Sequence, residues 1–382
     1  MDILQIHNRY RQSGGEDVIV EREAELLRAS GHRVYQHQTE NPAGPLGAAT
    51  NLVLAPWNPG SYLKAGKVSD EFQPDVAHVH NTWFSQSPSV IDSLDRRGIP
   101  MVMSLHNYRL TCVNGLLLRD GEPCRLCVGR SPLPGVRHKC YNHSYLASTI
   151  AAATLGLGRL KKTWQKVSVF LANSSFVKDQ YVSAGLHADQ IEVKPNFVPD
   201  PGPRTRDPED SDTLLYVGRL SPEKGVEFLT ELWKDSPVAG LKLRIIGGGP
   251  LYDRLRRDNP EIEFTGERSR EKVSAEMLSA RALLFPSLAY ETNPLAIIEA
   301  FAAGLPVVAS NRGAMTEMVR CLGEPWLREA RDLDDWGEGI QLLADDNHIG
   351  NGGVWARKAY LANHTSEVAI ENLEASYRRA MS

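Results

Sequence analysis

Short apolar runs with the length and composition of β-strands alternate with helix-like segments along almost the whole chain. In the first half, strand-like runs occupy residues 3–7, 32–35, 75–80, 100–105 and 167–172. In the second half they occupy residues 213–217, 241–246, 262–264, 282–285 and 306–309. Alternation of this kind is typical of βαβ units, so the sequence predicts an α/β fold with parallel sheets.

The alternation is interrupted at residues 195–212, a stretch rich in proline and charge with almost no apolar side chain after Val198. Such a composition is typical of a linker. We therefore expect two doubly wound, Rossmann-like domains, residues 1–198 and 213–365, joined by a linker at 199–212 and facing a ligand cleft. Residues 366–382 are expected to form a helix that packs back on the N-terminal domain, and a length of 382 residues suits this organisation.

The net charge and hydropathy of the chain indicate which classes of partner and which location to expect. A formal net charge of −4 gives no basic excess, so we expect no nucleic-acid partner. We find no signal peptide and no apolar run of 18 residues, so a cytoplasmic location is expected. Residues 145–166 predict a helix of small apolar residues with a basic end. That helix either belongs to the core or lies peripherally on the anionic inner face of a membrane.

Two glutamates, Glu291 and Glu299, lie in a predicted strand–loop–helix unit. Glu291 falls in the loop after the strand at 282–285, and Glu299 falls in a helix predicted over 294–303. Thr292 or Asn293 can cap this helix, Pro294 suits its first position, and Gly304 suits its end. Ligands bind beyond the carboxyl ends of parallel strands, and the amides of a helix start favour phosphate. Two acids beside an anion site are best explained if they bind the hydroxyl groups of a sugar.

Basic and glycine residues follow other predicted strands. Arg219 and Lys224 come after the strand at 213–217 and can neutralise a diphosphate, although a basic surface turn is the alternative. Glycines at the strand ends let the backbone approach a phosphate, or they mark plain turns; they are Gly14, Gly15, Gly218 and Gly248. His106 ends the strand at 100–105 and either bonds a sugar hydroxyl near the reacting centre or is a structural histidine.

Taken in order, these motifs resemble the retaining GT-B glycosyltransferases of family 4, also called glycosyl transferases group 1. The resemblance covers nearly the whole chain and rests on the order and spacing of eight segments. They are Gly14-Gly15, residues 75–80, 104–107, 193–198, 216–225, 246–250 and 264–266, and the pair Glu291 and Glu299.

The resemblance implies transfer of a sugar from a nucleotide diphosphate-sugar of UDP or GDP type to an acceptor hydroxyl, with retention and with the departing phosphate as base. The acceptor would be a sugar, a glycolipid or a small molecule, chosen by loops at 41–65 and 107–145. The implied catalytic residues are His106, Arg219, Lys224 and Glu291. The implied donor-binding residues are Gly14, Gly15, Gly218, Arg219, Lys224, Gly248, Asn293, Pro294, Leu295 and Glu299, with Glu291 on a sugar hydroxyl and Glu299 on the ribose.

Three alternative functions can be distinguished by their sequence motifs. A nucleotide-sugar 2-epimerase shares the architecture but lacks this combination of acidic and basic motifs, and a non-catalytic carbohydrate-binding scaffold would not need it. Metal-dependent transfer would need an Asp-x-Asp motif. Asp210-Ser-Asp212 and Asp332-Leu-Asp334 have that form, but neither follows an early strand, so we expect catalysis without a metal or other cofactor.

Four of the five cysteines fall within residues 112–140, a loop-rich stretch with little core of its own. In a reducing compartment this density favours metal binding over disulfides. Cys112, Cys124, Cys127 and Cys140 are therefore predicted to hold a structural zinc ion. Free thiols or a disulfide pair are the alternatives, and His138 or His143 could replace one thiol. Cys321 is expected to be a free thiol.

Overall fold

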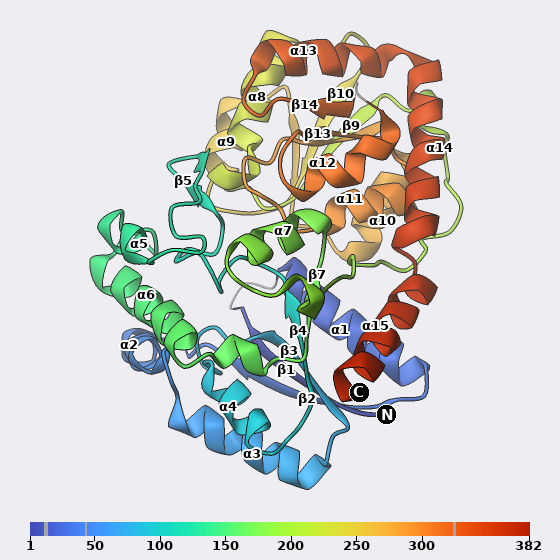
Figure 1. Cartoon of the computed structure of the whole chain (residues 1–382). Helices are drawn as coiled ribbons and strands as arrows, with labels where there is room; N and C mark the ends of the chain where they lie inside the picture. Colours follow the sequence, from blue (N-terminus) through green and yellow to red (C-terminus); the bar gives the residue numbers. More distant parts are fainter. Residues whose placement is uncertain (11–13, 43, 324–325) are drawn as a thin grey trace. The chain divides into compact units, whose positions relative to one another are not determined.

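The computed structural model describes residues 1–10, 14–42, 44–323 and 326–382, which form two compact units (Figure 1). Unit 1 comprises Met1–Arg119, Cys124–Pro195 and Ala369–Ser382. Unit 2 comprises Asp120–Pro123 and Asn196–Val368. Residues 199–212, expected as a linker, count with unit 2 because Arg204 donates hydrogen bonds to the carbonyls of Ala280 and Ala303.

Unit 1 is built on a parallel sheet of six strands among the described residues, in the order β2-β1-β3-β4-β7-β8. The strands are β1 (Asp2–Arg9), β2 (Arg33–Glu40), β3 (Val76–Asn81), β4 (Met101–Leu105), β7 (Val169–Ala172) and β8 (Ile191–Val193). β8 is missing from the sequence prediction because a run of three residues carries no periodicity. A small hairpin, β5 (Leu118–Arg119) with β6 (Glu122–Pro123), lies apart from this sheet.

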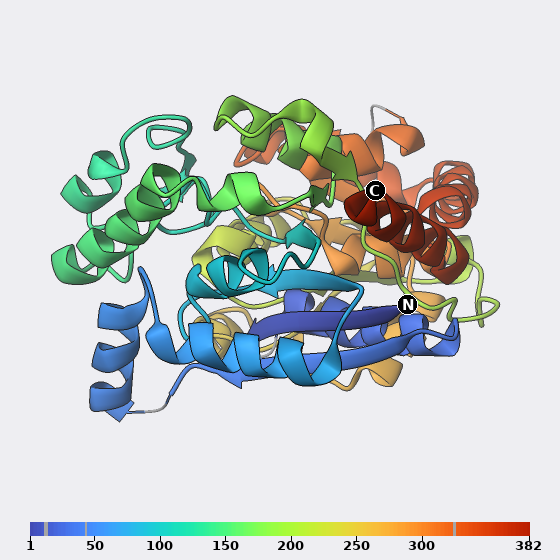
Figure 2. The same ribbon diagram turned by 60° about the horizontal axis from the view of Figure 1, so that its bottom comes forward.

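The helices of unit 1 include one that the sequence places far away. They are α1 (Gly15–Ala29), α2 (Gly44–Leu54), α3 (Pro59–Phe72), α4 (Ser89–Asp95), α5 (Leu133–Arg137), α6 (Tyr145–Leu160), α7 (Ser175–Ser183) and α15 (Ser366–Met381). Leu373 and Tyr377 of α15 join Ile3, Val76 and Leu171 in one buried cluster, so the last helix (dark red in Figure 2) completes the core of unit 1.

The expectation of a loop at 41–65 was wrong, because α2 and the start of α3 occupy these residues. Asn58 caps α3: its side-chain oxygen accepts from the amides of Gly60 and Ser61, and Pro59 takes the first helical position. This Asn-Pro start was a readable helix signal. Among the described residues, no helix is both long and apolar enough to cross a bilayer.

Unit 2 contains a second parallel sheet, which has six strands over the described ranges and the order β11-β10-β9-β12-β13-β14. The strands are β9 (Thr213–Val217), β10 (Lys242–Ile246), β11 (Glu263–Gly266), β12 (Ala282–Phe285), β13 (Val307–Ser310) and β14 (Leu327–Arg328). The chain leaves β9 towards β10 on one side and returns to pair β12 on the other. The carboxyl ends of β9 and β12 therefore flank the switch point, where open α/β sheets bind ligands.

The helices of unit 2 are α8 (Val226–Asp235), α9 (Tyr252–Asp258), α10 (Arg270–Ser279), α11 (Leu295–Ala302), α12 (Ala314–Val319), α13 (Leu333–Gln341) and α14 (Asp346–Asn363). Strand residues such as Leu214, Leu283 and Val308 are fully buried in a core shared with these helices. The prediction of two Rossmann-like, parallel-sheet domains is confirmed.

Candidate functional site

An ion pair lies at the switch point of unit 2. The Lys224 ammonium is 2.7 Å from Glu291 Oε1, and the Ser287 hydroxyl donates to the same oxygen at 2.6 Å. Lys224 follows β9, whereas Ser287 and Glu291 follow β12, so the two loops meet through these side chains. The Lys224 side chain is 29% exposed and that of Glu291 is 13% exposed. The pair is thus partly desolvated and still open enough to meet a ligand.

The backbone around the pair fixes the two loops together. Gly225 adopts a φ of 70°, and a Cβ there would lie 2.0 Å from the Pro286 carbonyl oxygen. The Leu288 amide donates to the Glu223 carbonyl at 2.9 Å. Only glycine permits this approach, so the sequence at 225 brings Lys224 up to the β12 loop.

Close contacts between backbones require glycine at two positions after β10. A Cβ on Gly247 would lie 1.9 Å from the Gly218 carbonyl oxygen, and one on Gly249 would lie 2.5 Å from that of Leu220. The Leu220 amide donates to the Gly248 carbonyl at 2.8 Å. These glycines let the β9 and β10 loops touch. Arg219, between them, is exposed, and within the described part of the chain its guanidinium has no acidic partner within 4 Å.

The start of α11 differs from the prediction. The helix begins at Leu295 and Pro294 occupies its cap position, so the prediction that Thr292 or Asn293 is the cap residue was wrong. The Asn293 side chain instead accepts from the Asn196 amide at 2.7 Å and donates to the Met318 sulfur at 3.2 Å. Glu299 lies half-buried in the second turn of α11. The first turn of this helix therefore keeps its anion-binding character.

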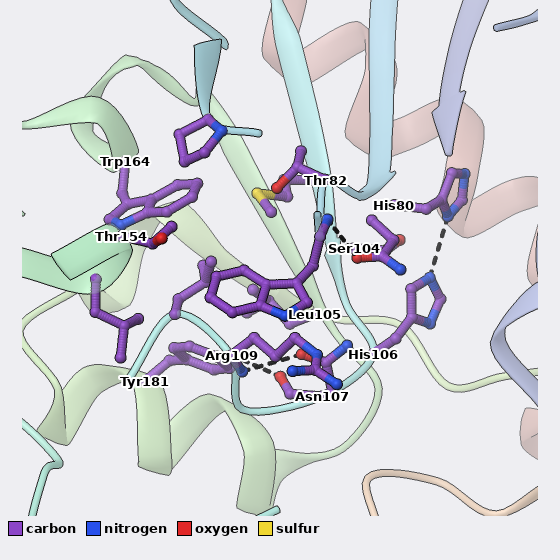
Figure 3. A pocket seen from close by; sticks show the side chains of 16 residues that line it. His80, Thr82, Ser104, Leu105, His106, Asn107, Arg109, Thr154, Trp164 and Tyr181 are labelled. Atoms are coloured by element: carbon purple, nitrogen blue, oxygen red, sulfur yellow. Dashed lines mark hydrogen bonds between the residues drawn. The ribbon is translucent and has the colours of Figure 1, made fainter. Parts of the chain in front are cut away.

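In unit 1, His106 follows β4, as predicted, and lies beside a small cavity of about 30 Å³. Figure 3 shows its ring facing His80, with 3.1 Å between His106 Nε2 and His80 Nδ1. Burial lowers the pKa of His106 to about 3. This histidine is therefore neutral near pH 7 and suits hydrogen bonding to a hydroxyl better than proton donation.

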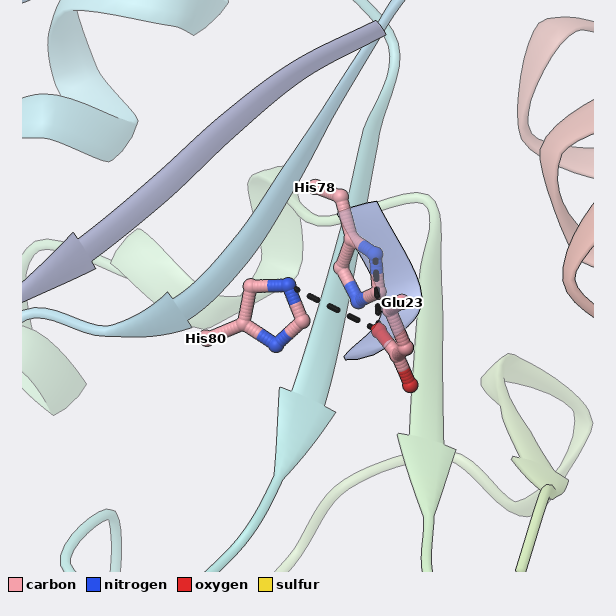
Figure 4. A group of neighbouring side chains, drawn as sticks. All are labelled: Glu23, His78 and His80. Carbon is pink, nitrogen blue, oxygen red and sulfur yellow. Dashed lines mark ion pairs between the residues drawn. The ribbon is translucent and has the colours of Figure 1, made fainter. Parts of the chain in front are cut away.

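His80, which faces His106, belongs to a buried polar network that the sequence did not predict. His78 and His80 point from β3 towards Glu23 of α1, each with one ring nitrogen 3.8 Å from Glu23 Oε2 (Figure 4). Lys194 forms a buried ion pair with Glu23. His78 also bonds the Tyr377 hydroxyl and the Ser104 hydroxyl, both at 2.8 Å.

Within the described ranges, Glu23, His78 and His80 form the one group of three or more potential metal ligands whose ligand atoms all lie within 4.8 Å of one another. Both nitrogens of His78 already have hydrogen-bond partners, and Lys194 already neutralises Glu23. The group is thus a structural network rather than a vacant metal site. No local pattern could have revealed it, because Glu23 and Lys194 are 171 residues apart.

One backbone amide at the start of α1 already has a hydrogen-bond partner within the same helix. Gly14 is the cap residue, and its amide donates to Asp17 Oδ2 at 2.8 Å. The other carboxylate oxygen of Asp17 lies 2.8 Å from His7 Nε2. Space beside Gly14 is open, since a Cβ there would meet nothing within 4 Å. A phosphate at Gly14 and Gly15 would share this helix start with Asp17.

The structure gathers four cysteines. Cys112, Cys124, Cys127 and Cys140 line one cavity of about 20 Å³, together with His138, and all four are free thiols. Burial, followed by the neighbouring sulfurs, raises the pKa of the Cys140 thiol to about 11. His143 does not line this cavity. Cys321 lies in unit 2, where its thiol donates to the Met318 carbonyl.

The two Asp-x-Asp motifs have structural roles. Asp212 precedes β9, at the amino edge of the sheet, and bonds the Lys242 ammonium at 2.6 Å. Asp332 caps α13 by accepting from the Asp335 amide at 3.0 Å. Neither motif lies at the carboxyl edge of β9 or β12.

Comparison with known proteins adds two family matches. Residues 203–354 match Glycosyl transferases group 1, and residues 13–200 match Glycosyltransferase Family 4. The chain is 25% identical to a D-inositol 3-phosphate glycosyltransferase of Nocardioides over 80% of its own length and 67% of that protein. It is 27% identical to a GDP-mannose-dependent alpha-(1-6)-phosphatidylinositol monomannoside mannosyltransferase of Mycobacterium tuberculosis, over 45% of its own length and 51% of that protein.

Solved structures share the fold across the whole chain. Sucrose-phosphate synthase from Thermosynechococcus elongatus aligns with a TM-score of 0.72 at 17% identity, covering 99% of this chain and 98% of that one. Anabaena Alr3699/HepE, solved with UDP and glucose, aligns with a TM-score of 0.66 at 16% identity, covering 98% and 99%. At these identities the likeness establishes the two-domain GT-B type of fold.

Proposed function

The chain belongs to the family 4 glycosyltransferases, and we propose that it moves a sugar from a nucleotide diphosphate-sugar to an acceptor hydroxyl with retention of anomeric configuration. The observation that carries this proposal is the contact between Lys224 and Glu291 at the switch point of unit 2. It puts a cation for phosphate and an acceptor for sugar hydroxyls side by side, where a parallel sheet binds ligands.

Unit 2 would bind the donor. Arg219 and Lys224 would hold the diphosphate, assisted by the amides of the first turn of α11 from Leu295 onward, because Pro294 itself has no N–H. Glu291 would accept from a sugar hydroxyl, and Glu299 from the ribose hydroxyls. When the donor is bound, the diphosphate competes with Glu291 for the Lys224 ammonium, which frees carboxylate oxygens for hydroxyl groups.

The reaction needs stabilisation of the leaving group. The bond from the anomeric carbon to the diphosphate oxygen breaks, and the acceptor oxygen bonds to that carbon on the same face. The acceptor proton passes to the released phosphate. Negative charge builds on the diphosphate during the step, and fixed cations stabilise it. Neutral His106 would bond a sugar hydroxyl near the reacting carbon. Arg219 and Lys224 supply the charge that a metal would otherwise provide, and both Asp-x-Asp motifs have structural roles.

The relatives indicate which substrates to test. One is named for GDP-mannose and phosphatidylinositol monomannoside, another for D-inositol 3-phosphate, and Alr3699/HepE was solved with UDP-glucose. We propose a UDP- or GDP-sugar donor and a sugar, glycolipid or small-molecule acceptor in polysaccharide, glycolipid or natural-product assembly. The acceptor would contact unit 1.

A donor panel tests the proposal. Purified protein is incubated with UDP- and GDP-sugars, with and without hydroxyl acceptors, and nucleotide diphosphate release is measured alongside product anomeric configuration by NMR. Acceptor-dependent release with a retained anomer is expected, and it should need no added divalent metal. Release with a free 2-epimer would identify an epimerase. Absence of release with every donor would indicate a binding scaffold.

Peripheral membrane contact stays part of the proposal, with a cytoplasmic location. Tyr145, Leu146 and Leu160 of α6 are exposed, as are Lys161 and Lys162 after it. Exposed apolar and basic side chains on one helix suit an anionic membrane surface. Sedimentation with anionic but not zwitterionic vesicles, reduced in Leu160→Ser, is the expected result. Absence of sedimentation with either vesicle type would overturn this part of the proposal.

A further inference from the structure

The segment from Cys112 to Cys140 has little regular structure to hold it. Its described elements are the two-residue strands β5 and β6 and the five-residue helix α5. Leu116, Leu126 and Leu133 are exposed, and the buried apolar side chains of the segment, besides Cys127, are Val113, Leu117, Leu118 and Val128. A segment of this kind needs another source of stability, as small domains with poor cores do.

The backbone of this segment also contains uncommon conformations. Leu117 and Lys139 have positive φ values of 50° and 49°, in the left-handed region that non-glycine residues rarely adopt. Such conformations persist only where the surroundings impose them, and the free energy of metal binding is a strong means of doing so.

We propose that Cys112, Cys124, Cys127 and Cys140 bind one zinc ion in a closed, structural site. All four cysteines line the same small cavity, although they are spread over 29 residues of the sequence. Cys124 directly precedes, and Cys127 lies within, a turn closed by the Val128 amide on the Arg125 carbonyl, and the spacing of the two cysteines suits two ligands of one ion. Four thiolates complete a tetrahedron and leave no position for catalysis.

Neighbouring groups favour four sulfurs over a mixed ligand set. His138 lines the cavity, but its Nδ1 lies 3.2 Å from an Arg119 guanidinium nitrogen. Arg119 also lines the cavity, and its charge would balance the net negative charge of a zinc–tetrathiolate centre. Within the described residues no three of the sulfurs lie mutually within 4.8 Å. Zinc–sulfur bonds of about 2.3 Å therefore require the segment to contract around the ion.

The ion would also order the loop that follows His106. Cys112 lies six residues beyond His106, and its amide donates to the Tyr108 carbonyl at 2.8 Å. Arg109, between them, packs its guanidinium over the rings of Trp83 and Tyr141, at 5.4 Å and 5.8 Å from the ring centroids. Tyr141 follows Cys140 directly. Zinc binding to Cys112 and Cys140 would thus fix both the loop that carries Arg109 and the segment that carries its ring partner Tyr141.

Metal analysis of protein purified without added metal tests the site. About one zinc per chain is expected in the wild type and in Cys321→Ser, and none in Cys124→Ser. In native protein only Cys321 should react readily with a thiol reagent, and chelation should expose four further thiols. Because Cys124→Ser could fail to fold, the wild type is also refolded with Co²⁺, which should give thiolate-to-cobalt absorption.

Three results would overturn the proposal: zinc-free protein with five reactive thiols, zinc content unchanged in Cys124→Ser, or disulfides among the four cysteines after purification under reducing conditions. None of these results bears on sugar transfer. The donor panel can therefore succeed while the zinc site fails, or the reverse.

Discussion

Lys224 is the single residue whose loss should most affect turnover. Lys224→Ala removes a cation from the transition-state charge, so kcat/KM should fall by about 100-fold. Stability should change by about 1 kcal/mol or less, because the Ser287 hydroxyl still donates to Glu291 and water reaches the position. Initial rates and thermal unfolding measure both effects.

Lys272→Ala is the matched control, since Lys272 is an exposed lysine of unit 2 on α10. It should leave kcat/KM unchanged. A Lys224→Ala enzyme with the turnover of the control would remove Lys224 from the site.

Glu291 and Glu299 should fail in different ways. Glu299→Ala should weaken binding of the bare nucleotide by about 1–3 kcal/mol, because the ribose hydroxyls lose their partner. Glu291→Ala should not weaken that affinity, because it frees Lys224 for the diphosphate, but it should reduce turnover. Calorimetry with UDP or GDP, followed by steady-state kinetics, separates the two. Wild-type nucleotide affinity in Glu299→Ala would show that the two roles are wrongly assigned.

At the residue scale, the expected and observed positions agree for charged residues in the loops that follow strands. Lys224 and Glu291 were expected in one site because both follow strands of a parallel sheet, and the structure brings them into contact. It failed for Asn293, whose partner Asn196 is 97 residues away. A cap prediction considers only the backbone amides at the helix start, so it takes no account of a distant amide that competes for the same side chain.

The histidines of β3 make unit 1 sensitive to acid. Burial is the first cause that lowers the pKa values of His78, His80 and His106 below the ordinary 6.5. The unfolded chain therefore binds more protons below pH 6.5, and each histidine removes about 1.4 kcal/mol of stability per pH unit in that range. Glu16 acts in the opposite sense, since burial raises its pKa to about 7. Three histidines outweigh one carboxyl, so stability should fall with pH.

Urea unfolding at pH 7.5 and pH 5.5, followed by circular dichroism, measures this loss. His80→Asn should reduce the difference between the two pH values. His187→Asn should not, because His187 is exposed. An unfolding midpoint independent of pH would contradict the burial of neutral histidines.

At the scale of elements, the sequence predicted strands better than helices. Buried parallel strands are short continuous apolar runs with turn residues beside them, so β1, β3, β4, β9 and β12 were all expected within two residues of their ends. Helices α2 and α3 were missed because small residues and glycines in 44–66 obscure their periodicity. Only the cap at Asn58 carried a clear signal.

For the whole molecule, the decisive feature is that unit 1 is discontinuous. Its core includes Leu373 and Tyr377, and the Tyr377 hydroxyl lies 2.8 Å from His78 Nδ1, 299 residues away. A fragment of residues 1–195 should therefore unfold at a lower temperature and less cooperatively than unit 1 in the intact chain. A synthetic peptide of residues 366–382 should raise its midpoint, because it restores the buried contacts.

The same peptide carrying Leu373→Asp is the control and should have no effect. Calorimetry of the fragment with each peptide decides the question. A fragment as stable as the intact unit 1 would show that α15 contributes little. The proline-rich break at 195–212 predicted two halves, and residues 366–382 were expected to pack back on the N-terminal one, although no periodicity of the helix itself identifies that partner.

This discontinuity also has a consequence during synthesis. The ribosome makes the strands of unit 1 before unit 2 and makes most of α15 after it. His78 and its neighbours therefore lack Tyr377 until unit 2 has been synthesised. A nascent chain that terminates early leaves the N-terminal sheet with an exposed apolar face, which chaperones and proteases recognise. Completion of unit 1 therefore requires that unit 2 has already been synthesised.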